Sequence, residues 1–165
     1  YLQTVDLKLC DLRQMKKGEL SKHVKEKDTV LWEEEMNEKT SIGIYKSCKE
    51  HIKEDLIYDN TPASVILYQA RTNTLPLEDR KRHENKPTTC QLCKEETEDL
   101  EHFIMDCKQI GQARNQIPVL QRPHNQPKED TIRDLLFTKE GQEGMERRKE
   151  WLYKLWRARM KTLKK

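Results

Sequence analysis

The sequence has few aromatic residues and no long apolar run. Of its 165 residues, 6% are aromatic, 34% are hydrophobic and 37% are charged, and the mean hydropathy is −1.05. No stretch is long enough to span a bilayer and the start carries no signal peptide, so we expect no membrane partner. The apolar residues recur at helical spacing, which favours a folded, mostly α-helical chain over a disordered one.

Motifs that carry catalysis are also missing. The sequence has no Gly-rich phosphate loop, no Gly-x-Ser-x-Gly, no His-Glu-x-x-His and no paired Asp-Asp motif of a polymerase. We therefore predict that this chain is not an enzyme in its own right. The first residue is Tyr1 and not Met, so we expect a piece of a longer protein.

Helix start and stop signals divide the chain into three expected parts, which are residues 1–60, 61–118 and 119–165. Gly18 predicts a break in the first part. Asn60 or Thr61 can cap a helix that has Pro62 at its first position, and Asp99 can cap another. The predicted helices cover about residues 41–58, 62–72, 76–83, 100–117, 130–137 and 145–163, and the proline-rich stretch 118–127 is expected to be a linker or loop.

Three of the five cysteines lie in a spacing typical of metal ligands. Cys90, Cys93, His102 and Cys107 follow the pattern Cys-x2-Cys-x8-His-x4-Cys. Three thiolates and one imidazole fill a tetrahedral zinc site, which leaves no open position for catalysis, so we predict one structural Zn²⁺. A chain with so little core material also gains from such a metal. Retroviral zinc knuckles have four residues and a glycine between the second Cys and the His, which this loop lacks.

The last two predicted ligands raise a geometric problem. His102 and Cys107 are five residues apart, which is roughly 140° around an ideal α-helix. Both can face one metal only if the helix loosens near Cys107. An odd number of cysteines with metal-ligand spacing also favours a reducing compartment, so we expect a nuclear or cytoplasmic protein.

Charge is unevenly distributed along the chain. Six acidic residues and one lysine lie between the outer metal ligands, and this loop should repel phosphate. Residues 146–165 hold nine bases and two acids, a net charge of +7. We predict phosphate contacts from a basic segment before the loop and from the last helix, at Arg71, Arg80, Lys81, Arg82, Arg157 and Lys161. The last helix also fits a docked surface helix with a solvated basic face, or a membrane-surface or calmodulin-target helix.

The stretch 61–107 resembles a known family. It reads Thr-Pro-Ala-Ser-Val-Ile-Leu-Tyr-Gln-Ala-Arg-Thr-Asn-Thr-Leu-Pro-Leu, then Arg-Lys-Arg at 80–82, then the Cys/Cys/His/Cys loop containing Glu-Asp-Leu-Glu-His-Phe at 98–103. This order is similar to the region after the polymerase in reverse-transcriptase proteins of non-LTR (LINE-type) retrotransposons. The resemblance covers about a third of the chain. The family's Arg-Thr-Gly after the helix is Arg71-Thr72-Asn73 here, so its glycine is replaced.

The resemblance implies a role as well as a ligand set. The family's zinc ligands correspond to Cys90, Cys93, His102 and Cys107. An accessory domain of this kind holds template RNA or target DNA during target-primed reverse transcription, beside the polymerase domain of the same parent protein. The downstream sequence has no Pro-Asp of a restriction-like nuclease, so we do not expect that activity. The alternative is a zinc-stabilised protein-interaction domain without nucleic-acid contact.

Overall fold

The computed structural model describes residues 15–49, 52, 58–121, 126–137 and 140–164. These residues are mostly helical and contain no β-strand, as predicted, apart from one isolated bridge between Thr89 and Thr97. The elements in chain order are α2 (Lys17–Glu38), η1 (Thr40–Ile42), α3 (Gly43–Cys48), α4 (Pro62–Arg71), η2 (Glu78–Glu84), η3 (His102–Asp106), η4 (Lys108–Ile110), α5 (Gly111–Arg114), η5 (Pro118–Leu120), α6 (Lys128–Leu136) and α7 (Gly141–Leu163). None of the helices in this part of the chain has the length and apolar character of a bilayer span.

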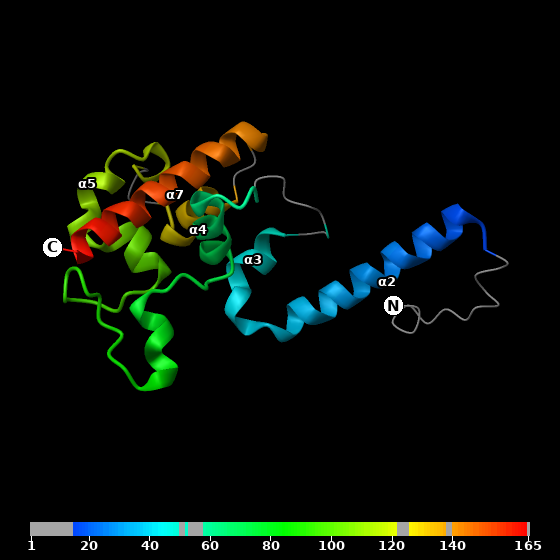
Figure 1. The fold of residues 1–165 in the computed structure, drawn as a ribbon, viewed down its shortest axis with the longest axis horizontal. Helices are drawn as coiled ribbons and strands as arrows, with labels where there is room; N and C mark the ends of the chain where they lie inside the picture. Colours follow the sequence, from blue (N-terminus) through cyan, green and yellow to red (C-terminus); the bar gives the residue numbers. More distant parts are fainter. Residues whose placement is uncertain (1–14, 50–51, 53–57, 122–125, 138–139, 165) are drawn as a thin grey trace. The chain divides into compact units, whose positions relative to one another are not determined.

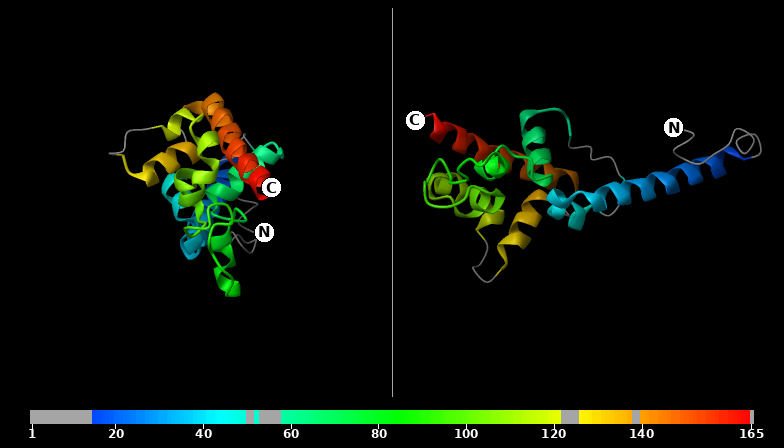
Figure 2. Two further views of the ribbon diagram at one scale, coloured as in Figure 1. Left: turned by 90° about the vertical axis from the view of Figure 1, so that its left-hand side faces the viewer. Right: turned by 90° about the horizontal axis from the view of Figure 1, so that it is seen from below.

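The chain forms two compact units, Tyr1–Glu54 and Asp55–Lys165. In the first, α2 is one uninterrupted helix (Figures 1 and 2) that begins at Lys17 after the extended Lys16, so the break predicted at Gly18 lies two residues earlier. Gly18 lies in the first turn, which Glu19 stabilises by accepting a hydrogen bond from the Lys16 N–H at 3.0 Å. Met36 is the one residue of α2 that is buried. The rest of the helix is mostly polar and carries the i,i+4 ion pair Lys22–Glu26.

Of the other predicted helix boundaries, one agrees with the structure and two differ from it. Thr61 caps α4 as expected, because its Oγ1 accepts a hydrogen bond from the Ser64 N–H at 3.3 Å. The helix predicted over about 41–58 is α3, which ends at Cys48, and most of residues 50–57 lie outside the described part. The last helix begins at Gly141, four residues before its predicted start, and includes Gly144. A Cβ at Gly144 would lie 2.3 Å from the Cβ of Glu140, so the glycine lets that side chain fold back over the helix.

The core of the second unit is made by α4, α6 and α7, which pack against one another (Figure 1). Each helix places leucines on the inner face at helical spacing. Leu67 of α4, Leu135 and Leu136 of α6, and Leu152 and Leu155 of α7 are all completely buried. Burying one such side chain contributes roughly 1.5–3 kcal/mol. The segments 61–118 and 119–165 are therefore joined through one shared core.

Arg71 lies inside this core and not on the surface. It is 3% exposed, and its guanidinium donates to the Leu136 carbonyl at 2.9 Å and to the Tyr58 hydroxyl at 2.8 Å. The ring of Phe137 lies 4.5 Å from the guanidinium carbon. The predicted phosphate contact at Arg71 is wrong, because its donors and both faces are engaged within the fold. Its position at the end of the buried α4 face explains why: the guanidinium joins α4 to the end of α6.

Replacing Arg71 by Met tests this assignment. The variant keeps the aliphatic volume but leaves the Leu136 carbonyl without its donor, so we expect the free energy of unfolding to fall by about 3 kcal/mol. Urea denaturation measures the change. Arg80→Met, at an exposed position, is the control and should change stability by less than about 0.5 kcal/mol. Equal stabilities of the two variants would contradict the structural role of Arg71.

Candidate metal centre

The first two candidate ligands lie on a narrow loop, residues 88–98. Its base is closed by two backbone hydrogen bonds, from the Glu98 N–H to the Thr88 carbonyl at 2.9 Å and from the Cys90 N–H to the Glu96 carbonyl at 2.7 Å. The loop therefore starts and ends at adjacent points and has little freedom to open. This closure holds Cys90 and Cys93 close together, so that both thiols could bind one metal ion.

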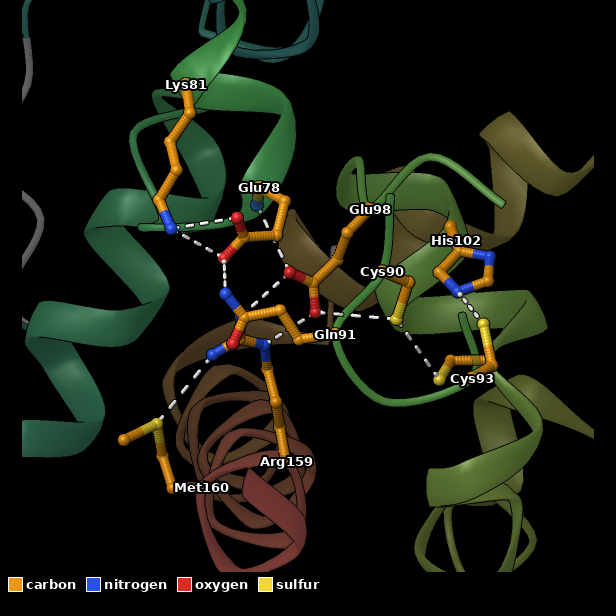
Figure 3. A network of polar contacts seen from close by, with 10 residues as sticks. Glu78, Lys81, Cys90, Gln91, Cys93, Glu98, His102, Arg159 and Met160 are labelled. Carbon is orange, nitrogen blue, oxygen red and sulfur yellow. Dashed lines mark hydrogen bonds and ion pairs between the residues drawn. The ribbon is translucent and has the colours of Figure 1, made fainter. Parts of the chain in front are cut away.

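A tight turn sets the direction of both thiols. The Lys94 N–H donates to the Cys90 carbonyl at 3.0 Å, and Lys94 has a φ of 62°, in the left-handed region. A lysine there costs more backbone free energy than the glycine that usually occupies such positions. The turn places the Cys93 sulfur beside the His102 ring and the Cys90 sulfur beside Glu98 (Figure 3).

The other two candidate ligands come from a widened helical turn. Asp99 begins the turn, and its carboxylate accepts a hydrogen bond from the His102 N–H at 2.8 Å, so the predicted cap is confirmed. The following η3 is a π-helix, in which the Cys107 N–H donates to the His102 carbonyl at 2.8 Å, five residues back. This i→i+5 bond is the loosening that the sequence required, because it stacks residues five apart on one side of the turn.

Arg114 stabilises the widened turn. Its Nε donates to the Ile104 carbonyl at 2.7 Å and its Nη2 to the Cys107 carbonyl at 2.9 Å. These carbonyls lie where the regular helix ends, so a guanidinium supplies the donors that the backbone does not. Burial lowers the pKa of Arg114, against the attraction of nearby acidic groups.

The four candidate ligand atoms converge on one point. They all lie within 4.8 Å of one another. The Sγ atoms of Cys90 and Cys107 are 3.9 Å apart, and the Sγ of Cys93 is 3.4 Å from the Nε2 of His102. Cys90, His102 and Cys107 are buried and Cys93 is half-buried. The structure thus brings the four predicted ligands together, and the group can hold one metal ion.

The second nitrogen of His102 is also engaged. Its Nδ1 lies 2.9 Å from a carboxylate oxygen of Glu96, whereas Nε2 faces Cys93. A carboxylate that accepts from Nδ1–H keeps the Nε2 lone pair available to a metal and holds the ring in place. Glu96 therefore has a defined role, although in the sequence it is one of six similar acids.

The thiols differ in their acidity. Burial raises the pKa of Cys90 to about 12 and also raises the pKa of Cys107. For Cys93, burial acts upward, but hydrogen bonds from the backbone N–H groups of Glu95 and Glu96 outweigh it, so its pKa is lowered. Cys93 is thus the thiol that ionises most readily, and a metal ion would displace the protons of Cys90 and Cys107 on binding.

A buried ion pair connects the metal-binding loop to α7 (Figure 3). Arg159 donates from Nε to Glu98 Oε1 and from Nη2 to Glu98 Oε2, both at 2.8 Å. The side chains are 4% and 1% exposed. The two parallel, charge-assisted hydrogen bonds fix direction as well as distance.

Glu98 has further partners that extend the connection. Its Oε2 accepts from the Glu78 N–H at 3.1 Å, and its backbone carbonyl accepts from the Asp79 N–H at 3.1 Å. Its Oε1 lies 3.7 Å from the Cys90 sulfur. Next to the pair, the Arg159 guanidinium lies 5.0 Å from the Trp156 ring. One carboxylate therefore joins η2, the metal-binding loop and α7.

The other residues predicted to contact phosphate differ in their exposure and in whether they form ion pairs within the protein. Arg80, Arg157 and Lys161 are exposed. Lys81 is half-buried and donates to both carboxylate oxygens of Glu78 at 2.8 Å, and Arg82 pairs with Asp79. The first basic segment therefore has part of its charge neutralised by its own acids, and the two residues on α7 are more open.

Sequence reasoning missed Glu98, Arg159 and Arg114. Arg159 does carry a signal, because it continues the buried spacing of Leu152 and Leu155 on α7. An arginine on an apolar face needs a buried acidic partner. Its partner lies 61 residues away in an acid-rich loop, so no local pattern identifies it.

Comparisons of the chain with models of known protein families, with curated proteins and with solved structures return no match.

A double-mutant cycle tests the Glu98–Arg159 pair. Arg159→Met leaves a buried carboxylate without its partner, so we expect a loss of about 3–5 kcal/mol in urea denaturation. Glu98→Gln should cost a similar amount, and the double variant should lose clearly less than the sum of the two. Arg157→Met on the exposed face is the control and should be nearly neutral. Additive losses would show that the two side chains do not interact.

The thiol pKa values predict opposite pH effects with and without metal. In the metal-free fold, Cys90 holds its proton more tightly than an unfolded cysteine does. Stability should therefore fall as pH rises from about 8.5 toward 12. Metal binding near neutral pH should release at least two protons, so apparent affinity should rise about 100-fold per pH unit. Competition titrations with a coloured chelator between roughly pH 6.5 and 7.5 measure this slope, and a flat profile would exclude thiolate ligation.

Proposed function

We propose that the metal is a single structural Zn²⁺. Typical Zn–S and Zn–N distances in a tetrahedral site place two sulfurs about 3.8 Å apart and a sulfur and a nitrogen about 3.6 Å apart. The Cys90–Cys107 separation of 3.9 Å and the Cys93–His102 separation of 3.4 Å in the structure are close to these values. Soft thiolates with one imidazole are also the donor set that suits zinc. All four positions are filled by protein, so the ion has a structural role.

The chain itself serves as a nucleic-acid-binding accessory domain. The observation that carries this proposal is the combination of the four-ligand group with a terminal helix whose exposed positions are basic. Ion pairs within the protein neutralise part of the +7 charge of residues 146–165, but Arg157 and Lys161 remain exposed. Arg80 adds a third exposed base, on the segment that Glu98 attaches to the loop.

The resemblance of residues 61–107 to non-LTR retrotransposon proteins supports a more specific role. In this role the domain holds template RNA or target DNA beside the polymerase domain of its parent protein, in the nucleus or cytoplasm. The chain contributes binding and no reaction of its own. The buried Arg71 fits this role as a structural residue that holds the preceding helix against the core.

A protein-interaction domain is the second candidate, and one observation favours it. Val65 and Tyr68 on the outer side of α4 are 45% and 52% exposed. Two large apolar side chains three residues apart form a small surface of the kind that binds protein partners. This role predicts binding that nuclease treatment and moderate salt leave unchanged.

One titration distinguishes the two functions. The full chain is titrated by fluorescence anisotropy against unrelated RNA and DNA at two salt concentrations, and its metal content is measured on the same sample. We expect one zinc per chain and binding that weakens steeply with salt for all sequences. One zinc without nucleic-acid binding would overturn the accessory role and favour the protein-interaction domain. A chain that folds without zinc would overturn the metal assignment.

A further inference from the structure

Seven of the nine bases of residues 146–165 divide into an inner and an outer group. Of the other two, Arg147 is exposed and pairs with Glu140 at 3.4 Å, and Lys165 lies outside the described residues. Three point into the fold and are buried. Arg148 pairs with Glu140 at 2.9 Å, and Arg159 pairs with Glu98 at 2.8 Å. Lys149 is likewise buried and forms ion pairs of its own. These three charges are neutralised inside the protein and are not available to a partner.

The outer group forms a straight row, here called the outer stripe. It consists of Lys154, Arg157, Lys161 and Lys164, spaced three, four and three residues apart, and all four are exposed. At about 100° per residue, each lies within about 40° of the direction opposite Arg159. Within the described part of the chain, none of the four forms an ion pair. The Glu98–Arg159 pair therefore turns the outer stripe away from the acidic loop, which would repel a polyanion.

The stripe is larger than helix stability alone requires. Cations near a helix C-terminus favour the helix dipole, which accounts for Lys161 and Lys164. That effect falls off within the last turn, so it does not account for Lys154 and Arg157. The opposite face of α7 is occupied, because Leu152 and Leu155 are completely buried in the core. The helix thus has no free apolar face to insert into a lipid surface, as an interfacial helix needs.

We infer that the outer stripe binds the sugar–phosphate backbone of a double-stranded nucleic acid, through phosphate contacts alone. This inference rests on the proposed function and names the element that carries it. Ten residues of helix span about 15 Å, and duplex DNA presents one phosphate per strand for every 3.4 Å of axis. A straight row of four cations therefore covers a length of axis that carries about four phosphates of each strand.

The residue types in the outer stripe favour binding of a duplex over binding of a single strand. Proteins that bind single strands combine cations with aromatic rings on which the bases stack. The stripe itself holds no aromatic residue, and Tyr153 at its edge is half-buried. It also offers no amide or carboxylate to read adenine or cytosine edges, which leaves guanine as the base that its cations can recognise. The proposed contact is to the backbone, so the affinity should not change with the sequence of the duplex.

The test compares three forms of the full, zinc-loaded chain. The stripe variant replaces Lys154, Arg157, Lys161 and Lys164 with Gln. The charge-matched control replaces Lys16, Lys17, Lys22 and Lys25 with Gln, which are four exposed bases in or next to α2. All three forms are titrated by anisotropy with a mixed-sequence duplex of about 20 base pairs, with its single strand, and with anionic vesicles, between roughly 50 and 200 mM salt. Urea denaturation checks that stability stays within about 0.5 kcal/mol.

We expect the stripe variant to lose about 3.6 units of the slope of log K against log salt on the duplex, at about 0.9 per phosphate contact. Over that salt range, the affinity of the stripe variant should therefore fall by a factor about 150 times smaller than the factor for the wild type. The control should lose less than one unit, and changing the duplex sequence should change nothing.

Three results would overturn the inference, and they differ from failure of the proposed function. A stripe variant with the slope of the wild type would assign the contacts to other bases while leaving nucleic-acid binding intact. Tighter binding of the single strand would exclude the duplex, and binding of vesicles in place of the duplex would assign the stripe to a membrane. A wild-type chain that binds no nucleic acid at all would instead reject the proposed function, and the inference with it.

Discussion

The buried pair between Glu98 and Arg159 is the interaction on which the arrangement of the second unit depends. The loop that carries the metal ligands has almost no apolar residues of its own, so the hydrophobic effect alone does not attach it to the helices. A bidentate ion pair that is 1% and 4% exposed provides this attachment and fixes the rotation of α7 at the same time. Removing either side chain would leave the other as a buried, unpaired charge, so the two residues stabilise the structure only together.

The four candidate ligands and this ion pair both connect segments of a chain that has little apolar core material. The candidate ligands Cys90, Cys93, His102 and Cys107 come from a hairpin-like loop and from a π-helical turn. The turn is held by its buried Phe103 and Ile104, whereas the loop is mostly polar. One ion held by all four ligands would cross-link the two segments. Arg114 and Glu96 support the same group by satisfying carbonyls and orienting the imidazole. Polar contacts thus perform here what a larger core would do elsewhere.

The function that we propose uses charge in two opposite ways on one helix. The inner bases Lys149 and Arg159 connect α7 to Asp59 and Glu98, Arg148 pairs with Glu140 at the start of the same helix, and the outer stripe faces away from the fold. Net charge along the sequence does not separate these roles, since +7 counts both groups equally. Once the internal ion pairs are set aside, the four exposed cations of the outer stripe remain available to bind a nucleic acid. They lie on the side of α7 opposite the acidic loop.

The sequence by itself determined the helical class, the start of α4 after Asn60 or Thr61, the Asp99 cap and the spacing of the four ligands, because each depends on residues close together in the chain. It also indicated that the turn before Cys107 has to loosen, but it did not identify the π-helix or Arg114. The last helix begins four residues before its predicted start and includes Gly144, since glycine is tolerated when neighbouring contacts stabilise the helix. Only the tertiary structure decided that Arg71 is buried and that Arg159 meets Glu98. The burial of a charge depends on which distant acid, carbonyl or ring the fold brings beside it, and that information is not local in the sequence.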